Sequence, residues 1–140
     1  MPTRRSEAEW NGGLKDGHGR MRFGGYSFPY FFASRFEAGN GTNPEELLGA
    51  AHAGCFSMAL SVLLEKNGVK PQKVYTKADV HLELVEGGYA ITRIDLTTEV
   101  HAAGIDEETF HRYANETKAG CPVSRALSGT EVTLRAKLSR

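Results

Sequence analysis

A long apolar segment in the middle of this sequence limits what the chain can fold into. It reads TNPEELLGAAHAGCFSMALSVLLEKNG, and from Leu47 to Leu64 only His52, Ser57 and Ser61 are polar. A helix with apolar side chains all round is stable only when it is covered on every side. We therefore expect a central helix that is buried from all directions.

Residues with suitable capping chemistry mark both ends of this helix. Asn43 can cap it, Pro44 suits the first helical position, and Glu46 stands three residues after Asn43, as in a capping box. Asn67 and Gly68 end the apolar pattern and favour helix termination. The predicted helix lies between these two signals.

The N-terminal third has the composition of short strands joined by tight turns. Eight of the 16 glycines lie between Gly12 and Gly41, where they alternate with aromatic residues. The stretch GHGRMRFG, residues 17–24, is rich in glycine but leads into a strand-like sequence instead of a helix. We interpret it as a turn and not as a phosphate-binding loop.

The C-terminal half alternates between strand and helix patterns. Residues 74–84 and 90–100 have apolar side chains at every second position around a Glu-Gly-Gly turn, which predicts a hairpin. Residues 130–138 show the same alternation and are expected to join its sheet. Between them Asp106 caps an amphipathic helix that ends at Gly120.

The size of the chain constrains how the central helix is covered. Its 140 residues suffice for one domain, residues 1–140, with a moderate core. Three-stranded sheets cover such a helix poorly, so a homodimer that pools strands and central helices from two chains is the economical solution. The predicted fold class is α+β, with antiparallel sheets around buried central helices.

Charge and composition exclude some classes of partner. Lys and Arg together number 17, and so do Asp and Glu. This balance indicates neither nucleic acid nor an anionic membrane surface as a partner. The first residues include basic side chains with no apolar run after them, and we expect no membrane-spanning segment. These features predict a cytoplasmic protein.

Two cysteines, Cys55 and Cys121, are the candidate reactive groups. In a reducing cytosol they would be inert buried thiols, metal ligands or redox-active groups. A metal site needs three or four convergent ligands, whereas these two lie 66 positions apart without a Cys-x-x-Cys pair. The sequence also lacks a Walker lysine loop and the His-Glu-x-x-His of zinc proteases. We therefore expect no metal.

Cys121 lies in AGCPVSRALSG, where Pro122 has the features of a first helical residue. Cys121 would then be the N-cap, where the helix dipole favours a thiolate by about 0.3 to 1 kcal/mol and lowers the pKa of the thiol. The alternative interpretation is an ordinary corner between two helices.

Cys55 stands among apolar residues, so desolvation should raise the pKa of its thiol. For Cys55 to react, a cation must approach, either His52 one helical turn away or an arginine from elsewhere. A histidine in such a position is more often a core residue with its hydrogen bonds satisfied. Glu45 lies about 15 Å from Cys55 along a straight helix, so it could help only from a partner chain or across a helix break.

Two motifs carry a resemblance to a known family. RFEAGNGTNPEELLGAAHAGCFSMAL, together with GCPVSRAL, resembles the osmotically inducible protein C and organic hydroperoxide resistance family (OsmC/Ohr), specifically its osmotically inducible protein C branch. The resemblance covers essentially the whole chain. It implies an OsmC-like fold, in which α+β subunits form an intertwined homodimer, and thiol-dependent reduction of organic hydroperoxides.

The resemblance also implies site residues. By matching motifs these are Arg35, Glu45, Cys55 and Cys121, all of which are present. In the family the helix cysteine attacks the peroxide and the Cys-Pro cysteine resolves it, which reverses what N-cap electrostatics alone suggests. An arginine reaching Cys55 in a medium of low dielectric constant would offset desolvation of its thiolate. Taken alone, Arg35 would be a surface arginine at the end of a strand, and Glu45 a first-turn glutamate that favours the helix dipole.

The expected reaction oxidises Cys55 to a sulfenic acid, which Cys121 converts to a disulfide. The resemblance implies a dithiol as reductant, such as dihydrolipoyl groups on lipoylated enzymes, and no metal or bound cofactor. Two alternatives remain at this point. One is a non-catalytic dimeric binding protein with buried thiols, and the other is a hydrolase that uses Cys55 and His52 for acyl transfer.

Overall fold

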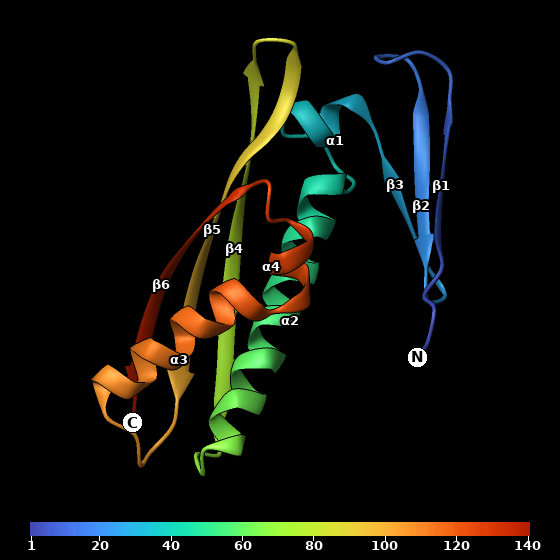
Figure 1. The fold of residues 1–140 in the computed structure, drawn as a ribbon. Coiled ribbons are helices and arrows are strands. Elements are labelled where there is room, and N and C mark those ends of the chain that lie inside the picture. Colours follow the sequence, from blue (N-terminus) through green and yellow to red (C-terminus); the bar gives the residue numbers. More distant parts are fainter. The chain divides into compact units, whose positions relative to one another are not determined.

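The computed structural model describes all residues, 1–140, in two compact units, Met1–Leu47 and Leu48–Arg140 (Figure 1). Each unit is described by itself. The elements in chain order are β1 (Ser6–Asn11), β2 (His18–Phe23), β3 (Tyr26–Tyr30), α1 (Phe32–Phe36), α2 (Pro44–Lys66), β4 (Lys73–Val85), β5 (Gly88–His101), α3 (Glu107–Gly120), α4 (Pro122–Ala126) and β6 (Glu131–Ser139).

The first unit contains a three-stranded antiparallel sheet in the order β1-β2-β3, followed by the short helix α1. The predicted β structure is confirmed, but residues 17–24 are not a turn, because His18–Phe23 forms the central strand. Gly19 packs against the rings of Trp10 and Tyr30, and an added Cβ would lie 2.5 Å from the tyrosine ring. Glycine at this position therefore permits close packing of these two aromatic side chains.

The second unit contains a three-stranded sheet in the order β4-β5-β6. Strands β4 and β5 form the predicted antiparallel hairpin, with a register shift between His81 and Leu82. Strand β6 joins the same sheet, as expected, but it pairs with β5 in parallel. The expectation of purely antiparallel sheets was wrong. The helices between β5 and β6 carry the chain back to the end of the sheet where β5 begins, so β6 runs in the same direction as β5.

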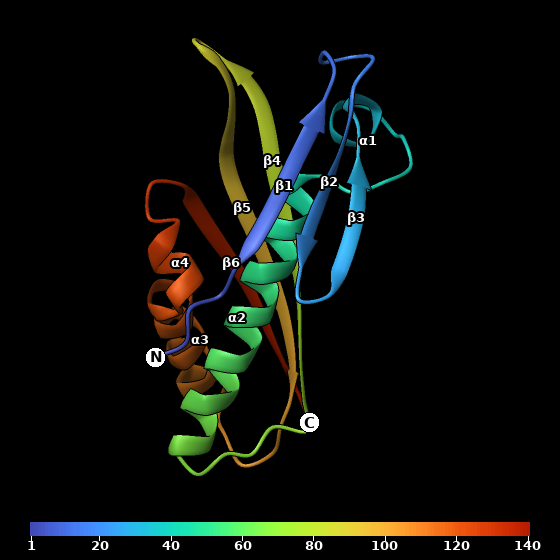
Figure 2. The same ribbon diagram turned by 90° about the vertical axis from the view of Figure 1, so that its right-hand side faces the viewer.

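Helices α3 and α4 form that connection and lie on one side of the sheet, as Figures 1 and 2 show. Asp106 caps α3 as predicted, with its carboxylate accepting a hydrogen bond from the Thr109 amide at 3.0 Å. Phe110, Ala114 and Thr117 form the buried stripe of the helix. Helix α3 is therefore amphipathic and packs its apolar side inward.

Helix α2 begins and ends where the sequence indicates. The Asn43 side chain accepts a hydrogen bond from the Glu46 amide at 2.8 Å, while the Glu46 carboxylate accepts one from Thr42 instead of completing the capping box. Gly49 allows close contact with β4, because a Cβ there would lie 3.2 Å from Val80 Cγ2. Ser57 donates a hydrogen bond to Thr76 of the same strand at 2.7 Å.

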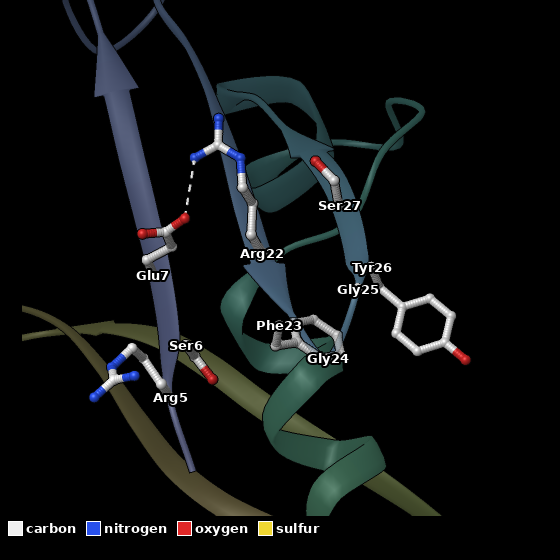
Figure 3. A pocket seen from close by; sticks show the side chains of 9 residues that line it. All are labelled: Arg5, Ser6, Glu7, Arg22, Phe23, Gly24, Gly25, Tyr26 and Ser27. Atoms are coloured by element: carbon white, nitrogen blue, oxygen red, sulfur yellow. Dashed lines mark ion pairs between the residues drawn. The ribbon is translucent and has the colours of Figure 1, made fainter.

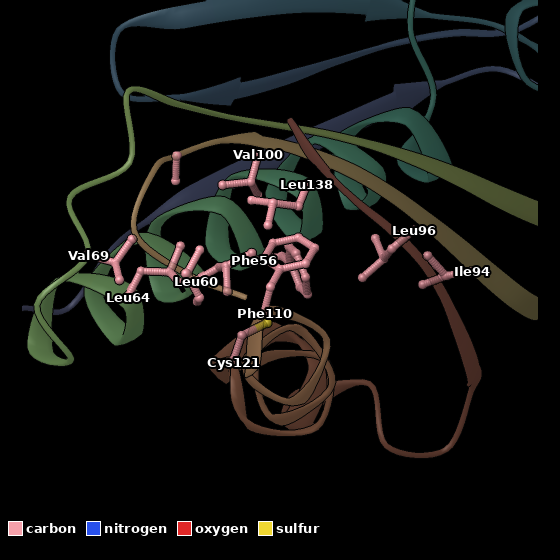
Figure 4. Packing of buried hydrophobic residues seen from close by; sticks show 12 residues of the cluster. Phe56, Leu60, Leu64, Val69, Ile94, Leu96, Val100, Phe110, Cys121 and Leu138 are labelled. Carbon is pink, nitrogen blue, oxygen red and sulfur yellow. The ribbon is translucent and has the colours of Figure 1, made fainter. Parts of the chain in front are cut away.

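The core of the second unit forms where one side of α2 meets the sheet and α3 (Figure 4). Phe56, Leu60 and Leu64 are completely buried at four-residue spacing along α2. They belong to one cluster with Val100 of β5 and Phe110 of α3. This spacing places the three α2 side chains in one row, so a single helix face supplies most of the contact with the sheet.

The opposite side of α2 is apolar but exposed within the single chain. Met58 is 72% exposed and Val62 is 43% exposed. By length and composition α2 could cross a membrane, contrary to the expectation that no segment could, but the core helix of a soluble protein has the same features. Only 28% of its most apolar stretch is buried in the chain, so burial on all sides is not achieved by one chain alone.

Candidate active site

Cys121 is the N-cap of α4, as the sequence predicts. Gly120 ends α3, Pro122 is the first residue of α4, and the Cys121 sulfur accepts a hydrogen bond from the Ser124 amide at 3.4 Å. The thiol donates to Ser124 Oγ at 3.2 Å. With 1% exposure, Cys121 is fully enclosed in the core.

Cys55 lies on α2, half-buried, and packs against the core cluster that includes Cys121, close enough for the two thiols to influence each other. Burial raises the pKa of Cys55, and its neighbour Cys121 raises it further, whereas the backbone amide of Val123 lowers it. The upward direction agrees with the prediction from the apolar sequence. Helix α2 and the start of α4 thus bring together two free thiols that are 66 positions apart.

An apolar hollow of about 410 Å³ opens to solvent beside Cys55. Its lining side chains come from α2 and the start of α4, and they are Cys55, Met58, Ala59, Val62, Leu63, Lys66 and Pro122. Because Cys121 is enclosed, the thiol that a dissolved molecule can reach through this hollow is that of Cys55. The two thiols therefore lie near each other, but only that of Cys55 is accessible to solvent.

Arg35 and Glu45 form an ion pair within the first unit. Arg35 Nε and Nη2 both donate to Glu45 Oε1, at 2.9 Å and 2.8 Å. Glu45 is 7% exposed, and its second carboxylate oxygen has no hydrogen-bond partner. Arg35 lies in α1 and not at the end of a strand, and it also stacks over the Phe36 ring. The structure thus pairs Arg35 with Glu45 and Cys55 with Cys121, in different units of the chain.

His52 is completely buried, and its Nε2 lies 2.7 Å from Ser124 Oγ. The predicted alternative, in which His52 acts directly on Cys55, finds no support in this arrangement because Nε2 is engaged with Ser124. Sequence reasoning missed Ser124. A usable signal was its position three residues after the N-cap Cys121, which is where capping-box side chains turn back toward the cap.

A second hollow lies in the first unit and is lined by residues of β1, the end of β2 and the start of β3 (Figure 3). Arg22 forms ion pairs there with Glu7 at 3.9 Å and Glu9 at 2.7 Å. The hydrogen bond from Arg22 lowers the pKa of Glu9. These groups are solvent-exposed, and their charges are satisfied by one another, so this hollow offers no reactive group comparable to the thiols.

The fold and the facing thiols define a class: an α+β protein with an internal cysteine pair suited to thiol–disulfide chemistry. The family model described as "OsmC-like protein" matches residues 37–136. The chain therefore belongs to the OsmC-like protein family.

Individual relatives place it within that family. The chain is 48% identical over 134 residues to the protein named "Peroxiredoxin OsmC" of Escherichia coli (strain K12), covering 94% of this chain and 93% of that protein. It is 30% identical over 98 residues to the "Organic hydroperoxide resistance protein" of Xanthomonas axonopodis pv. citri (strain 306), covering 69% and 67%. The higher identity and coverage place it in the OsmC branch.

Solved structures share the mixed α+β fold. The crystal structure of an OsmC-like protein from Mycoplasma pneumoniae matches with a TM-score of 0.79 at 14% identity, covering 99% of both chains. The organic hydroperoxide resistance protein OhrB of Bacillus subtilis matches with a TM-score of 0.67 at 26% identity, covering 96% of this chain and 98% of that one. The fold with two three-stranded sheets and a long helix is thus that of the family.

The proximity of the two thiols predicts an intramolecular disulfide. Treatment of the reduced protein with diamide should link Cys55 to Cys121 within one chain, because α2 and α4 already hold the sulfurs together. Peptide mapping under nonreducing conditions detects the link, and Cys55→Ser is the matched control that cannot form it. Links only between chains, or two persistently free thiols, would contradict the described geometry.

Proposed function

We propose that this protein reduces organic hydroperoxides to alcohols, with Cys55 attacking the peroxide and Cys121 resolving the product. The observation that carries the proposal is the proximity of an accessible and an enclosed thiol. A peroxidase with two cysteines needs this difference in accessibility. One thiol must be open to the substrate, and the other must lie close enough to form the disulfide. The 48% identity to a named peroxiredoxin supports the same activity.

In the first step the Cys55 thiolate attacks the terminal oxygen of the hydroperoxide. A sulfur–oxygen bond forms, the oxygen–oxygen bond breaks, and the alkoxide takes up a proton and leaves as the alcohol. Cys55 is oxidised to a sulfenic acid while the peroxide is reduced by two electrons. The reaction requires neither a metal nor a bound cofactor.

In the second step Cys121 attacks the sulfur of the Cys55 sulfenic acid. A disulfide forms and the hydroxyl group leaves as water after taking up a proton. A dithiol then reduces the disulfide by thiol–disulfide exchange, and we assign that role to dihydrolipoyl groups on lipoylated enzymes. These reductants, like the reaction, would place the protein in the cytoplasm.

Arg35 and Glu45 are proposed to activate Cys55. Within its own unit no cation lowers the pKa of Cys55. Burial raises that pKa and disfavours the thiolate. A guanidinium brought to the sulfur would reverse that preference in a medium of low dielectric constant. Glu45 holds Arg35 through two hydrogen bonds and would thereby orient it.

A homodimer is proposed to complete both the fold and the site. The exposed side of α2 carries Met58 and Val62, and a second copy of the same helix would cover it. Residues 1–140 would then act as one domain in an intertwined pair of subunits. Arg35 and Glu45 could serve Cys55 of their own chain or of the other subunit.

The apolar hollow favours organic substrates over hydrogen peroxide. An alkyl chain that leaves water for this surface gains about 25 cal/mol per Å² buried, a contribution that hydrogen peroxide cannot make. Phe31, Phe32, Phe36 and Met58 are the apolar side chains we expect along the substrate's path.

Single-turnover kinetics with a sulfenic-acid trap distinguish the two cysteine roles. Cys55→Ser should abolish the first turnover, because a hydroxyl lacks the nucleophilicity of a thiolate. Cys121→Ser should still consume about one peroxide per site and accumulate the trapped sulfenic acid. If Cys121→Ser loses the burst while Cys55→Ser keeps it, the roles are reversed. If neither thiol of the wild-type protein is consumed, a non-catalytic binding protein is the better description.

Arg35→Ala should raise the pKa of Cys55, because the desolvated thiolate loses its cation. The peroxide-consuming burst at neutral pH should slow by at least about tenfold, which corresponds to one pKa unit, and recover as the pH rises. Thiolate absorbance against pH measures the pKa directly. Arg22→Ala is the matched control, since Arg22 pairs with Glu9 at an exposed surface. An unchanged titration curve for Arg35→Ala would remove Arg35 from the site.

The proposed dimer predicts that a charge on the exposed apolar face of α2 dissociates it. Met58→Asp should convert a dimer into a monomer at low micromolar concentration, because the carboxylate would be desolvated in the interface. Light scattering measures the mass. The control is Glu116→Lys at an exposed position of α3, which should remain dimeric. A wild-type monomer under the same conditions would contradict the shared interface.

A further inference from the structure

The two cysteines do not account for the buried network beside them. His52, Ser124 and Cys121 form a continuous chain of hydrogen bonds inside the second unit. His52 Nε2 is 2.7 Å from Ser124 Oγ, and Ser124 Oγ is 3.2 Å from Cys121 Sγ. The three residues are at most 7% exposed, so the chain is closed to water.

The direction of the hydrogen bond between His52 and Ser124 depends on the tautomer of His52. With the Cys121 thiol donating to Ser124 Oγ, we assign the single hydroxyl proton of Ser124 to the bond with His52 Nε2. Nε2 is then an unprotonated acceptor, and the ring proton is on Nδ1. This assignment follows from the hydrogen-bond network. His52 Nδ1 is buried without a hydrogen-bond partner. No acceptor at Nδ1 therefore stabilises the protonated, positively charged ring.

The surroundings of His52 keep its imidazole neutral and able to accept a proton. Burial lowers its pKa, and no charged group contributes to the shift. The titratable groups near it are the thiols, Cys55 on the same helix and Cys121 on α4. The other buried polar residues of the second unit are hydroxyl-bearing, so β4, β5, β6 and α3 contribute no buried ion that would face the ring.

We propose that His52 is a positioning residue that acts through Ser124 to accept the proton of Cys121 during resolution. This inference rests on the proposed function, in which Cys121 attacks the Cys55 sulfenic acid. As the sulfur–sulfur bond forms, the thiol proton passes to Ser124 Oγ and the hydroxyl proton of Ser124 passes to His52 Nε2. The hydroxide that leaves Cys55 takes up a proton from water in the open hollow and departs as water, and the His52 imidazolium afterwards releases its proton, so no net proton is gained or lost.

Burial of Cys121 makes such a route necessary. A thiol with 1% exposure cannot transfer its proton directly to bulk water, and a thiol is a much weaker nucleophile than its thiolate. General-base assistance of this kind contributes a factor of about 100 to 10,000 in rate. Ser124 both contacts the reacting sulfur and connects it to the only buried base of the second unit.

The pH dependence of resolution tests the proposal in the wild-type protein. After a single equivalent of hydroperoxide, the rate of disulfide formation should be flat from about pH 6.5 to about pH 8.5, because neutral His52 is available throughout. The rate should fall only on further acidification, when the imidazole becomes protonated. A wild-type rate that rises about tenfold per pH unit over this range would overturn the proposal, since it would show that solvent hydroxide supplies the thiolate.

Two variants separate proton transfer from structure. His52→Gln can keep a hydrogen bond to Ser124 but cannot take up a proton, and Ser124→Ala breaks the chain. In both, resolution near pH 6.5 should be about 100-fold slower and should rise with pH, while the first burst of peroxide consumption stays at the wild-type rate. His111→Gln, an exposed histidine on α3, should match the wild type in both steps.

The two steps also separate this inference from the proposed function. If the wild-type protein shows no burst, the peroxidase proposal fails. If the burst is normal and His52→Gln resolves at the wild-type rate with a flat pH profile, the peroxidase proposal stands and the role of His52 is refuted. Slow resolution that is equal at every pH would indicate a merely structural effect and would likewise refute it.

Discussion

Packing of one side of α2 against the β4-β5-β6 sheet is the interaction on which the second unit depends. The buried row formed by Phe56, Leu60 and Leu64 continues one turn toward the N-terminus to His52. Cys55 precedes Phe56 and lies at the border of this row, half-buried. The helical repeat therefore places a neutral base inside the core and a thiol at its edge, next to solvent.

The short helix α4 complements this arrangement. Its N-cap Cys121 and its third residue Ser124 face α2. Cys121 lies near Cys55, and Ser124 forms a hydrogen bond with His52. Pro122, which has no amide hydrogen, is the first residue of the helix. The next two amides have no partner within the helix, and those of Val123 and Ser124 donate to Cys55 and Cys121. One turn of helix thereby connects two thiols to a proton acceptor, while the surrounding core excludes water.

The second unit contains no buried ionised side chain beside its two thiols. Burial favours the neutral forms of both Cys55 and His52, and neither has an ionised partner within the unit. The ion pair between the exposed Arg35 and the buried Glu45 belongs to the first unit. A Cys55 thiolate therefore has no ionised partner inside the second unit, and its proposed activation requires a cation from outside that unit.

The sequence by itself determined the elements with strong local signals. The capped and apolar helix α2, the β4–β5 hairpin, α3 behind Asp106 and the N-cap role of Cys121 all follow from periodicity and capping, which act over a few residues. The motifs around Cys55 and Cys121 also indicated the family. The strand His18–Phe23 was interpreted as a turn because of its glycines, although its partners β1 and β3 adjoin it in sequence. Tertiary structure alone decided the parallel pairing of β6 and the partner of His52. Both depend on contacts between segments distant in sequence, and the His52–Ser124 bond spans 72 positions. No local pattern encodes such a contact, because it exists only once α2 and α4 have packed.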